Sequence, residues 1–464
     1  MSAIRAFDLR AWLIIAAFVV LNTVLLIVAA PGGHRETDTE NYYAVAEGLL
    51  EHGDLVRSDD PGTRVRLAPG YALLLAAGDV AGGGDATIPV VLVQLLALLV
   101  TGLITRDIVT AWLGRYHNLA LALVILNPNS LSMAQTLMPM TIYALALTAS
   151  VWAALKYARA PNFGHALLTG LFLGVAILFR LDPRFLIILL PVALPLLAIL
   201  DGRRAASWRT LSGGVAAAAF AIATISPWTA YVSRTGSDSR FSIAATAEYF
   251  LAANLGVLEK RLDPSLTPAN AATAAIERGY DNPVDLRGAN ETYDEFLSRS
   301  DVTRQFFHLL SNYSTTLIAR AAAVSQVTMF ASGGASNIRR ILGVSGDNSH
   351  ELYVREGYGD RLSAWFAWAS LSSPGSLALS IGAIGFAVTM RLLGLAGLFV
   401  LVMRRKWPIL LIVSTIVLYS VLLVMFNGLS RYRVPIVPHL MILSVFGIDH
   451  LLRLWMRIRG KATA

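Results

Sequence analysis

The chain has 464 residues, a formal net charge of +8 and no cysteine, and it is 55% hydrophobic but only 15% charged. Average soluble domains are about 25% charged, so this composition excludes an ordinary soluble globular protein. Apolar runs near twenty residues recur, which is the length that an α-helix needs to cross about 30 Å of hydrocarbon, and the alternating segments of a membrane β-barrel are not seen. We therefore predict an all-α polytopic membrane protein without disulfides, thiolate metal sites or thiol nucleophiles.

Ten apolar segments are candidate membrane spans. They cover residues 11–30, 87–105, 117–128, 132–155, 165–179, 185–200, 210–231, 380–403, 408–426 and 434–452. The first could be a signal peptide, but its apolar core is longer than the roughly 7–15 residues of a signal, which favours an uncleaved anchor. The third segment is short and meets the fourth at a predicted turn over residues 127–130. Ten spans place both termini on the same side of the membrane.

Charge differs between the two sides of this predicted topology. The segments that share a side with the termini are rich in Lys and Arg and contain few acids, so the positive-inside rule makes that side cytoplasmic. Two long segments, residues 31–86 and 232–375, then lie outside the cytoplasm. The basic balance thus reflects topology and attraction to anionic lipids, which argues against a nucleic-acid partner.

The same pattern predicts three parts. Residues 1–231 form an N-terminal module of seven spans with an outer loop at 31–86. Residues 232–375 form an extracytoplasmic loop domain with short helical patterns and turns marked by proline. Residues 376–464 form a C-terminal module of three spans. Loops this long usually serve as lids, binding surfaces or small domains.

The first outer loop begins with an acidic stretch, ETDTENYYAVAEGLL at residues 36–50. Asp38 or Thr39 can cap a helix that runs to about His52 along the membrane surface, with Gly53 as its stop. Asp38 and Glu40 then lie near the helix N-terminus, where the dipole favours carboxylates. Two interpretations stay open from this stretch alone: helix caps on a solvated face, or catalytic carboxylates held at the membrane surface.

Further motifs follow in a fixed order. Residues 64–71 read RVRLAPGY and lead into an apolar run, residues 226–228 read SPW at the end of the seventh span, and residues 431–438 read RYRVPIVP at the start of the last span. In this order the chain resembles the C-type (GT-C) integral-membrane glycosyltransferases, and it is most similar to bacterial relatives of the protein O-mannosyltransferases and the lipid A aminoarabinose transferases. The resemblance spans most of the chain in architecture, although each motif is short.

The resemblance implies a glycosyltransferase that uses a polyprenyl-phosphate-linked sugar on the outer face of the plasma membrane, with a cell-envelope glycan, lipid or protein as acceptor. In this family the acids of the first outer loop form a loose Asp-x-Asp-like motif, which Asp38 and Glu40 match. Asp38 is therefore the expected catalytic carboxylate, with Glu40 second. The residues establish no cofactor, and a divalent metal (Mg or Mn) on Asp38 and Glu40 stays open. Many relatives carry an acid at the start of the fourth span, whereas residues 135–141 contain none.

Glycosyl transfer with inversion needs a base for the acceptor hydroxyl and cations for the leaving phosphate. Arginine suits the second role because its planar fork binds phosphate oxygens in pairs. The candidates for donor or phosphate binding are Arg431 and Arg433 at the start of the last span, Arg391 deep in the eighth span, and Arg66 and Tyr71 in the RVRLAPGY motif. The alternative for the first three is anchoring or snorkelling at the membrane interface.

Two other functions stay open. A transporter or flippase for an envelope lipid is disfavoured because the sequence has no inverted repeats and no acid, His or Lys in the middle of a span. A catalytically inactive scaffold of the same fold is the third possibility, because residues 135–141 lack the acid that many relatives have.

Overall fold

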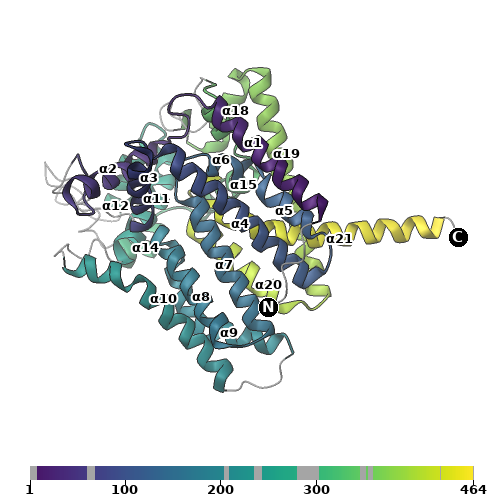
Figure 1. The fold of residues 1–464 in the computed structure, drawn as a ribbon. Coiled ribbons are helices and arrows are strands. Elements are labelled where there is room, and N and C mark those ends of the chain that lie inside the picture. The colour runs from purple at the N-terminus through teal and green to yellow at the C-terminus, as the bar shows by residue number, and fades with distance from the viewer. Residues whose placement is uncertain are drawn as a thin grey trace.

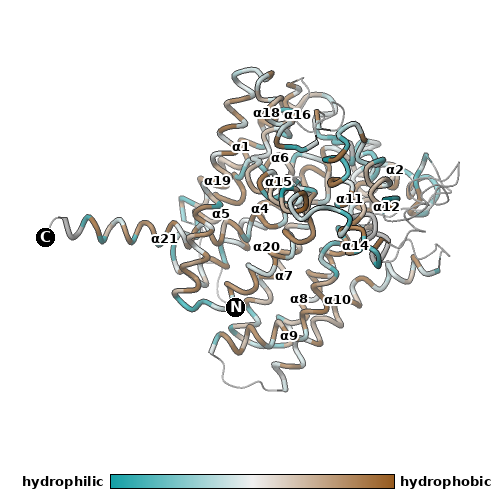
Figure 2. Tube along the Cα trace, turned by 180° about the vertical axis from the view of Figure 1, so that it is seen from behind, coloured by the Kyte–Doolittle hydropathy of each residue, from teal (hydrophilic) through white to brown (hydrophobic). Residues whose placement is uncertain are grey.

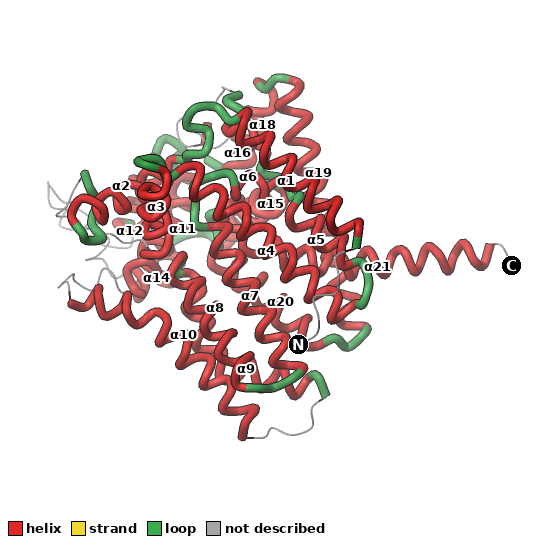
Figure 3. The backbone as a smooth tube through the Cα atoms, viewed as in Figure 1, coloured by secondary structure: helices red, strands yellow, loops and turns green. Residues whose placement is uncertain are grey.

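The computed structural model of the chain describes residues 8–59, 68–202, 208–234, 243–278, 302–344, 352–353, 359–428 and 430–462. Every regular element within these residues is a helix (Figure 3). Seven of the described helical segments are long and apolar enough to cross a membrane. The chain is thus an all-α polytopic membrane protein, as its composition predicts.

The spanning helices match the predicted segments closely. Those long and apolar enough to cross a membrane are α1 (Leu9–Val28), α4 (Thr87–Leu113), α9 (Leu186–Leu200) with the 3-10 turn η1 (Asp182–Phe185), α10 (Trp208–Arg234), α19 (Pro374–Met403), α20 (Trp407–Val424) and α21 (Val437–Ala462) with the 3-10 turn η4 (Ser430–Ile436). Two further predicted spans correspond to α7 (Met140–Arg159) and α8 (Phe163–Phe179). These helices form the bundle in Figure 1.

The third predicted span differs from the expectation. Helix α5 (His117–Ile125) has nine residues, or about 13.5 Å, and cannot cross a bilayer alone. Pro128 then opens a second short helix, α6 (Pro128–Ala134), whose first N–H groups are capped by the side chain of Asn127. The chain reverses only at residues 135–139, so the predicted turn at 127–130 is a break between two helices, and α7 begins at Met140 instead of at position 132.

Glycines allow the closest helix pairs to approach each other. A Cβ atom on Gly397 of α19 would lie 1.8 Å from the carbonyl oxygen of Leu443 in α21, and one on Gly447 would lie 2.0 Å from that of Leu393. A Cβ on Gly170 of α8 would meet the backbone of α10 in the same way. Small residues at such contacts are typical of helices packed in a membrane, where close van der Waals contact drives association.

The remaining helices gather around one end of the bundle, which we call the α2 end. They are α2 (Thr37–His52), α3 (Pro69–Gly82), α11 (Ile243–Leu262), α12 (Pro268–Glu277), α14 (Val302–Ser311), α15 (Thr315–Ala331), α16 (Ala335–Ile341) and α18 (Arg361–Leu371). Figure 2 shows hydrophilic segments among these helices, whereas α7, α8, α9 and α10 are mainly hydrophobic. Helices α11, α12 and α14 share an apolar cluster of their own, which reaches the bundle through Phe426.

A buried ionic network marks the other end of the bundle. The carboxylate of Asp449 in α21 is fully buried and contacts Arg404 at 3.0 Å, Arg453 at 3.1 Å and also Arg115. These residues join the end of α19 and the turn after α4 to the last helix. Beyond this network, α21 projects away from the bundle (Figure 1).

Candidate active site

The N-terminus of α2 carries the acidic stretch. Thr37 is the first helical residue and Glu36 is the N-cap, so Asp38 lies inside the first turn and is not the cap that the sequence suggests. The backbone N–H of Glu36 donates to the hydroxyl of Thr39 at 2.9 Å. Gly53 ends the helix in the left-handed conformation, as predicted.

The aromatic face of α2 packs on protein. Tyr42 and Tyr43 are buried, and the ring of Tyr42 meets the edge of Tyr71 in α3 with centroids 5.2 Å apart. The helix therefore rests on α3 through these side chains, whereas the sequence suggests a helix that lies on the lipid surface. This contact sets the position of the acidic first turn above the bundle.

Hydrogen bonds strap the start of α2 to the linker between α6 and α7. The Thr39 hydroxyl donates to the carbonyl of Leu137 at 3.0 Å, and the N–H of Leu137 donates to the carbonyl of His34 at 2.8 Å. The ring Nδ1 of His34 lies 2.6 Å from the carbonyl of Gln135. The region without an acid, residues 135–139, is thus a backbone platform under the acidic turn.

Buried side chains hold this platform from the bundle side. The amide nitrogen of Gln94 in α4 donates to the carbonyls of Ala134 at 2.9 Å and Thr136 at 2.8 Å. The Tyr71 hydroxyl donates to the Gln94 side-chain oxygen at 2.8 Å. Tyr71, a predicted donor-binding residue, is therefore fully buried and lies beneath the platform.

Two acids and two arginines meet above the platform, and we call them the acid–arginine cluster: Glu36, Asp38, Arg340 and Arg431. Asp38 Oδ2 lies 2.6 Å from Nη1 of Arg431, and Glu36 Oε1 lies 3.8 Å from the same nitrogen. Glu36 Oε2 lies 3.8 Å from Nη1 of Arg340, whose Nη2 donates to the Thr136 hydroxyl at 2.8 Å. The Asp38 side chain is 41% exposed, whereas that of Arg431 is only 18% exposed. The carboxylate is thus accessible from outside while the cation that faces it is held in the protein.

An aromatic and ionic pair borders the cluster. Arg180 forms an ion pair with Asp182 at 2.6 Å, and the guanidinium groups of Arg180 and Arg431 lie 5.4 and 5.6 Å from the ring centroid of Tyr432. Burial raises the pKa of Tyr42 to about 12, with the charge of Asp38 acting in the same direction and Arg180 against it. Tyr42 therefore faces the cluster as a neutral phenol at neutral pH.

Other predicted site residues lie away from the cluster. Glu40 is exposed and pairs with Arg35 at 3.6 Å. Arg433 is buried and donates through Nη1 to the carbonyls of Met329 at 2.6 Å and Phe330 at 3.1 Å, at the end of α15.

The two remaining candidates are Arg391 and Arg66. Arg391 lies within α19, about 18 Å from its end at Met403, and its Nε and Nη1 have no hydrogen-bond partner among the described residues. Arg66 lies outside the described residues.

Two cluster residues are absent from the predicted set. Glu36 begins the acidic stretch, where the sequence alone suggests no more than a residue at the start of a helix. No sequence pattern indicates its contact with Arg431. Arg340 lies in the long segment 232–375, within a seven-residue helix that no motif marks. Only the fold brings α16 against the linker after α6.

The donor set around Asp38 fits a divalent metal poorly. Asp38 and Glu36 both face Arg431, which occupies the place where a cation would balance them, and Glu40 pairs with Arg35 elsewhere. Among the residues that the structure describes, no three His, Cys, Asp or Glu side chains are grouped as metal ligands would be. The cluster balances its acids with arginine.

The cluster can accept a proton and bind an anion at adjacent points. A carboxylate is a suitable general base for a hydroxyl group. A guanidinium group has five N–H donors, and Arg431 meets both acids through Nη1. Arg431 is therefore able to hold Asp38 and still offer N–H groups to an oxyanion.

Comparison of the chain with known proteins finds distant structural matches only. No protein-family model and no curated protein matches the chain. Among solved structures, it is similar to ArnT from Cupriavidus metallidurans bound to undecaprenyl phosphate, with a TM-score of 0.41 and 16% identity over 94% of this chain and 78% of that one. The same protein in the apo state gives a TM-score of 0.38 and 16% identity, over 93% of this chain and 77% of that one.

A third solved structure is also similar. It is the archaeal oligosaccharyltransferase AglB from Archaeoglobus fulgidus in complex with an inhibitory peptide and a dolichol-phosphate, with a TM-score of 0.49 and 12% identity. The match covers 97% of this chain but only 52% of AglB, so the chain spans about half the length of that protein.

Proposed function

We propose that the chain is a glycosyltransferase that moves a sugar from a polyprenyl-phosphate-linked donor to a cell-envelope acceptor. The observation that carries this proposal is the ion pair between Asp38, which is accessible at the first turn of α2, and the largely buried Arg431. It places a proton acceptor beside a phosphate-binding group, which are the two elements that inverting transfer from a phosphate leaving group needs. The order of sequence motifs that resembles the GT-C glycosyltransferases supports the same function.

The proposed reaction is a single displacement. The acceptor oxygen attacks the anomeric carbon of the donor, and the bond from that carbon to the phosphate oxygen breaks with inversion. The acceptor proton passes to Asp38, and the bonding electrons leave with the phosphate, whose charge Arg431 stabilises. Arg340 adds positive charge from the far side of Glu36, and Glu36 positions both arginines.

We place the α2 end outside the plasma membrane. The support is the charge pattern of the loops together with the position of Arg404, Arg453 and Arg115 at the opposite end of the bundle. Polyprenyl-linked sugars are amphiphiles, so a site next to the apolar bundle lets the carrier chain stay in lipid. The glycan, lipid or protein nature of the acceptor is a further part of the proposal.

Donor turnover tests the function. The purified chain in detergent is given radiolabelled polyprenyl-phosphate sugars with envelope extracts as acceptor, and release of the free polyprenyl phosphate is measured. We expect turnover of at least one donor, which Asp38→Asn abolishes and Glu51→Gln, an exposed position on the same helix, leaves unchanged.

Two results would contradict the proposal. Movement of an intact labelled lipid across proteoliposomes without bond cleavage would identify a flippase. Binding of the donor without turnover in any acceptor extract would identify an inactive scaffold.

A further inference from the structure

The last helix extends beyond the bundle at the end opposite the α2 end. Asp449 is fully buried in the ionic network there, whereas all nine residues from 451 to 459 are exposed. The candidate span that includes α21 covers 29 residues, Arg431–Arg459, although about 20 suffice to cross the hydrocarbon layer. Because Arg431 lies in the acid–arginine cluster at the α2 end, the surplus lies at the C-terminal end. We call residues 451–459 the α21 extension.

The α21 extension exposes a series of large apolar side chains. Each is between 39% and 61% exposed, and they are Leu451, Leu452, Leu454, Trp455, Met456 and Ile458. The residues at positions 451, 454, 455 and 458 follow the spacing of one helix face. Transfer of such a face from water to an apolar environment is favourable, and an exposed apolar patch of this kind marks an interaction site.

The α21 extension is also basic. Arg453 and Arg457 lie one helical turn apart, on the face opposite the apolar one, and Arg459 follows two residues later. Arg453 lies 3.1 Å from the carboxylate of Asp449, and no acid follows Asp449 in the sequence. The extension therefore combines an apolar face with a net positive charge.

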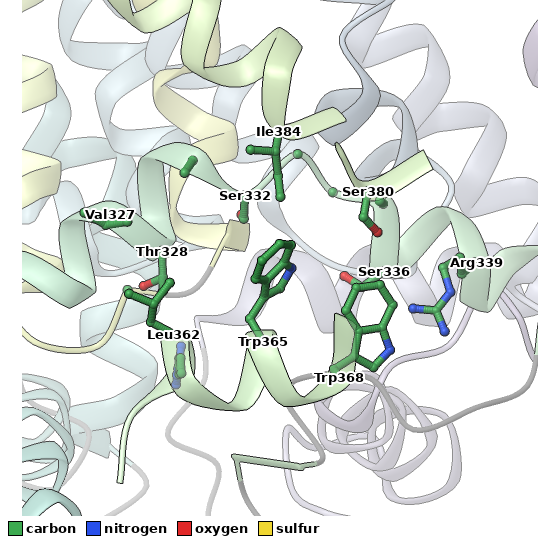
Figure 4. A pocket seen from close by; sticks show the side chains of 16 residues that line it. Val327, Thr328, Ser332, Ser336, Arg339, Leu362, Trp365, Trp368, Ser380 and Ile384 are labelled. Atoms are coloured by element: carbon green, nitrogen blue, oxygen red, sulfur yellow. The ribbon is translucent and has the colours of Figure 1, made fainter. Parts of the chain in front are cut away.

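An arginine lies against a tryptophan at both ends of the bundle. At the α2 end, Arg339 lies 4.7 Å from the centroid of a Trp368 ring, in a pocket of about 290 Å³ (Figure 4), and Trp368 is only 5% exposed. In the α21 extension, Arg459 lies 4.0 Å from the centroid of a Trp455 ring, but Trp455 is 51% exposed. The first contact is enclosed by protein and the second is open. Open Trp and Arg side chains are typical of the membrane interface, where the ring meets acyl chains and the guanidinium group meets phosphates.

The α21 extension begins at the level of the membrane surface. Asp449 lies 3.0 Å from Arg404, which directly follows the spanning helix α19. Arg405 and Lys406 continue the turn to α20 and add positive charge at the same end. The extension leaves this level obliquely to the spanning helices α1 and α4 (Figure 1). It therefore passes through the headgroup layer at a slant.

We propose that the α21 extension binds the surface of the membrane leaflet at this end, with its apolar face among the upper acyl chains and its arginines on the phosphates of anionic phospholipids. Helices with an apolar face that contains Trp and Leu and a polar face that contains Arg bind membrane surfaces in this way. A second copy of the chain could also cover the apolar face, but paired extensions would bring the arginines of both chains together, which is unfavourable. An anionic lipid surface instead balances them.

The depth of two positions in the membrane tests the proposal. The chain has no cysteine, so Ile458→Cys on the apolar face and Arg457→Cys on the basic face each accept one environment-sensitive dye. The full-length variants are placed in lipid nanodiscs of phosphatidylcholine alone or of equal parts phosphatidylcholine and phosphatidylglycerol. Quenching by a lipid with a spin label near its headgroup is then measured. We expect strong quenching at position 458 in the anionic discs, weaker quenching at position 457, and less quenching at position 458 in neutral discs or with added salt.

Removal of two arginines should release the extension. In the Ile458→Cys chain, Arg457→Gln combined with Arg459→Gln should lower the ratio of bound to free extension about 30-fold in anionic discs, since each basic residue near an anionic surface contributes about fivefold. Lysine at both positions keeps the charge and should keep the binding. Arg57→Gln, at the α2 end, is the matched control and should leave the quenching unchanged. If the double Gln variant does not fold, the salt dependence of the Ile458→Cys chain decides.

Three results would overturn the proposal: equal quenching at positions 457 and 458, equal quenching in neutral and anionic discs, or full quenching in the double Gln variant. A dye response that appears in detergent without added lipid and disappears on dilution would identify a second copy of the chain as the occupant. The α21 extension lies far from the acid–arginine cluster, so loss of donor turnover with quenching intact would contradict only the glycosyltransferase function.

Discussion

The Asp38 carboxylate lies 2.6 Å from Nη1 of Arg431, so the first turn of α2 and the 3-10 turn before the last helix form an ion pair. Glu36 approaches the same nitrogen from the N-cap position at 3.8 Å. Because the cap is Glu36, the role of Asp38 is not to begin the helix. Its exposed carboxylate and buried partner are the features from which the first two predictions follow.

Replacing Asp38 with Asn should abolish transfer and leave the fold intact. The amide cannot take the acceptor proton, and loss of a general base typically lowers the rate by about 10²–10⁴. The amide oxygen of Asn still accepts from Arg431 and Glu36 still faces the same guanidinium group, so the unfolding temperature should hardly change. Donor turnover and thermal unfolding of the purified variant are the two measurements. Transfer at the unmodified rate would show that the acidic stretch is only a solvated loop.

Arg431→Lys should lower kcat/KM for the donor by about 10- to 100-fold. Lysine keeps a charge beside Asp38 but loses the planar fork, and one charge-assisted hydrogen bond is worth about 1.5–3 kcal/mol. The comparison is with Arg57→Lys, an arginine that follows α2 and pairs with Asp59 outside the cluster. Equal donor kinetics in both variants would exclude Arg431 from phosphate binding.

Arg433 should behave differently from Arg431 even though the two are neighbours in the motif. Its Nη1 donates to the carbonyls of Met329 and Phe330 at the C-terminus of α15, where a cation is favourable. Arg433→Met leaves these carbonyls without a donor and should destabilise the fold by about 1–3 kcal/mol. Thermal unfolding measures the loss, and turnover per folded molecule should stay near the unmodified value. An unchanged unfolding temperature with lost turnover would instead support the donor-binding role.

The topology predicts opposite labelling of two introduced cysteines. The chain has no cysteine of its own, so Glu51→Cys on α2 and Arg457→Cys on the projecting end of α21 provide clean single sites. Both positions are exposed. An impermeant thiol reagent added to intact cells should modify position 51 and not position 457. Modification of both from outside would contradict the assignment of the α2 end to the extracytoplasmic side.

Hydropathy predicted the long helices well because each must satisfy its own backbone within lipid, which leaves a continuous apolar run in sequence. It was less accurate at α5 and α6. There Asn127 and Pro128 suggest a turn in the sequence, whereas in the structure they end one short helix and begin a second. The backbone platform after α6 is held by hydrogen bonds from the side chain of Gln94 in α4. Such a contact between distant segments leaves no periodic pattern in the sequence.

The candidate site was only partly predictable for a similar reason. Asp38 and Arg431 stand out in the sequence because each is a charge close to one end of a membrane-length apolar segment. Arg340 lies in a short helix of the long segment 232–375, and its partners come from α2 and the linker after α6. Pairing across such distances in sequence depends on the packing of the whole chain.

The last helix links the two faces of the protein mechanically. Arg431 lies in the turn that opens it, and Asp449 lies about 18 Å further along α21 from Val437, fixed by three arginines at the opposite end of the bundle. A helix transmits displacement along its axis, so the anchoring of Asp449 at one end constrains the position of Arg431 at the other. If Arg431 binds the donor phosphate as we propose, its reach towards that phosphate is set from the opposite end of the bundle.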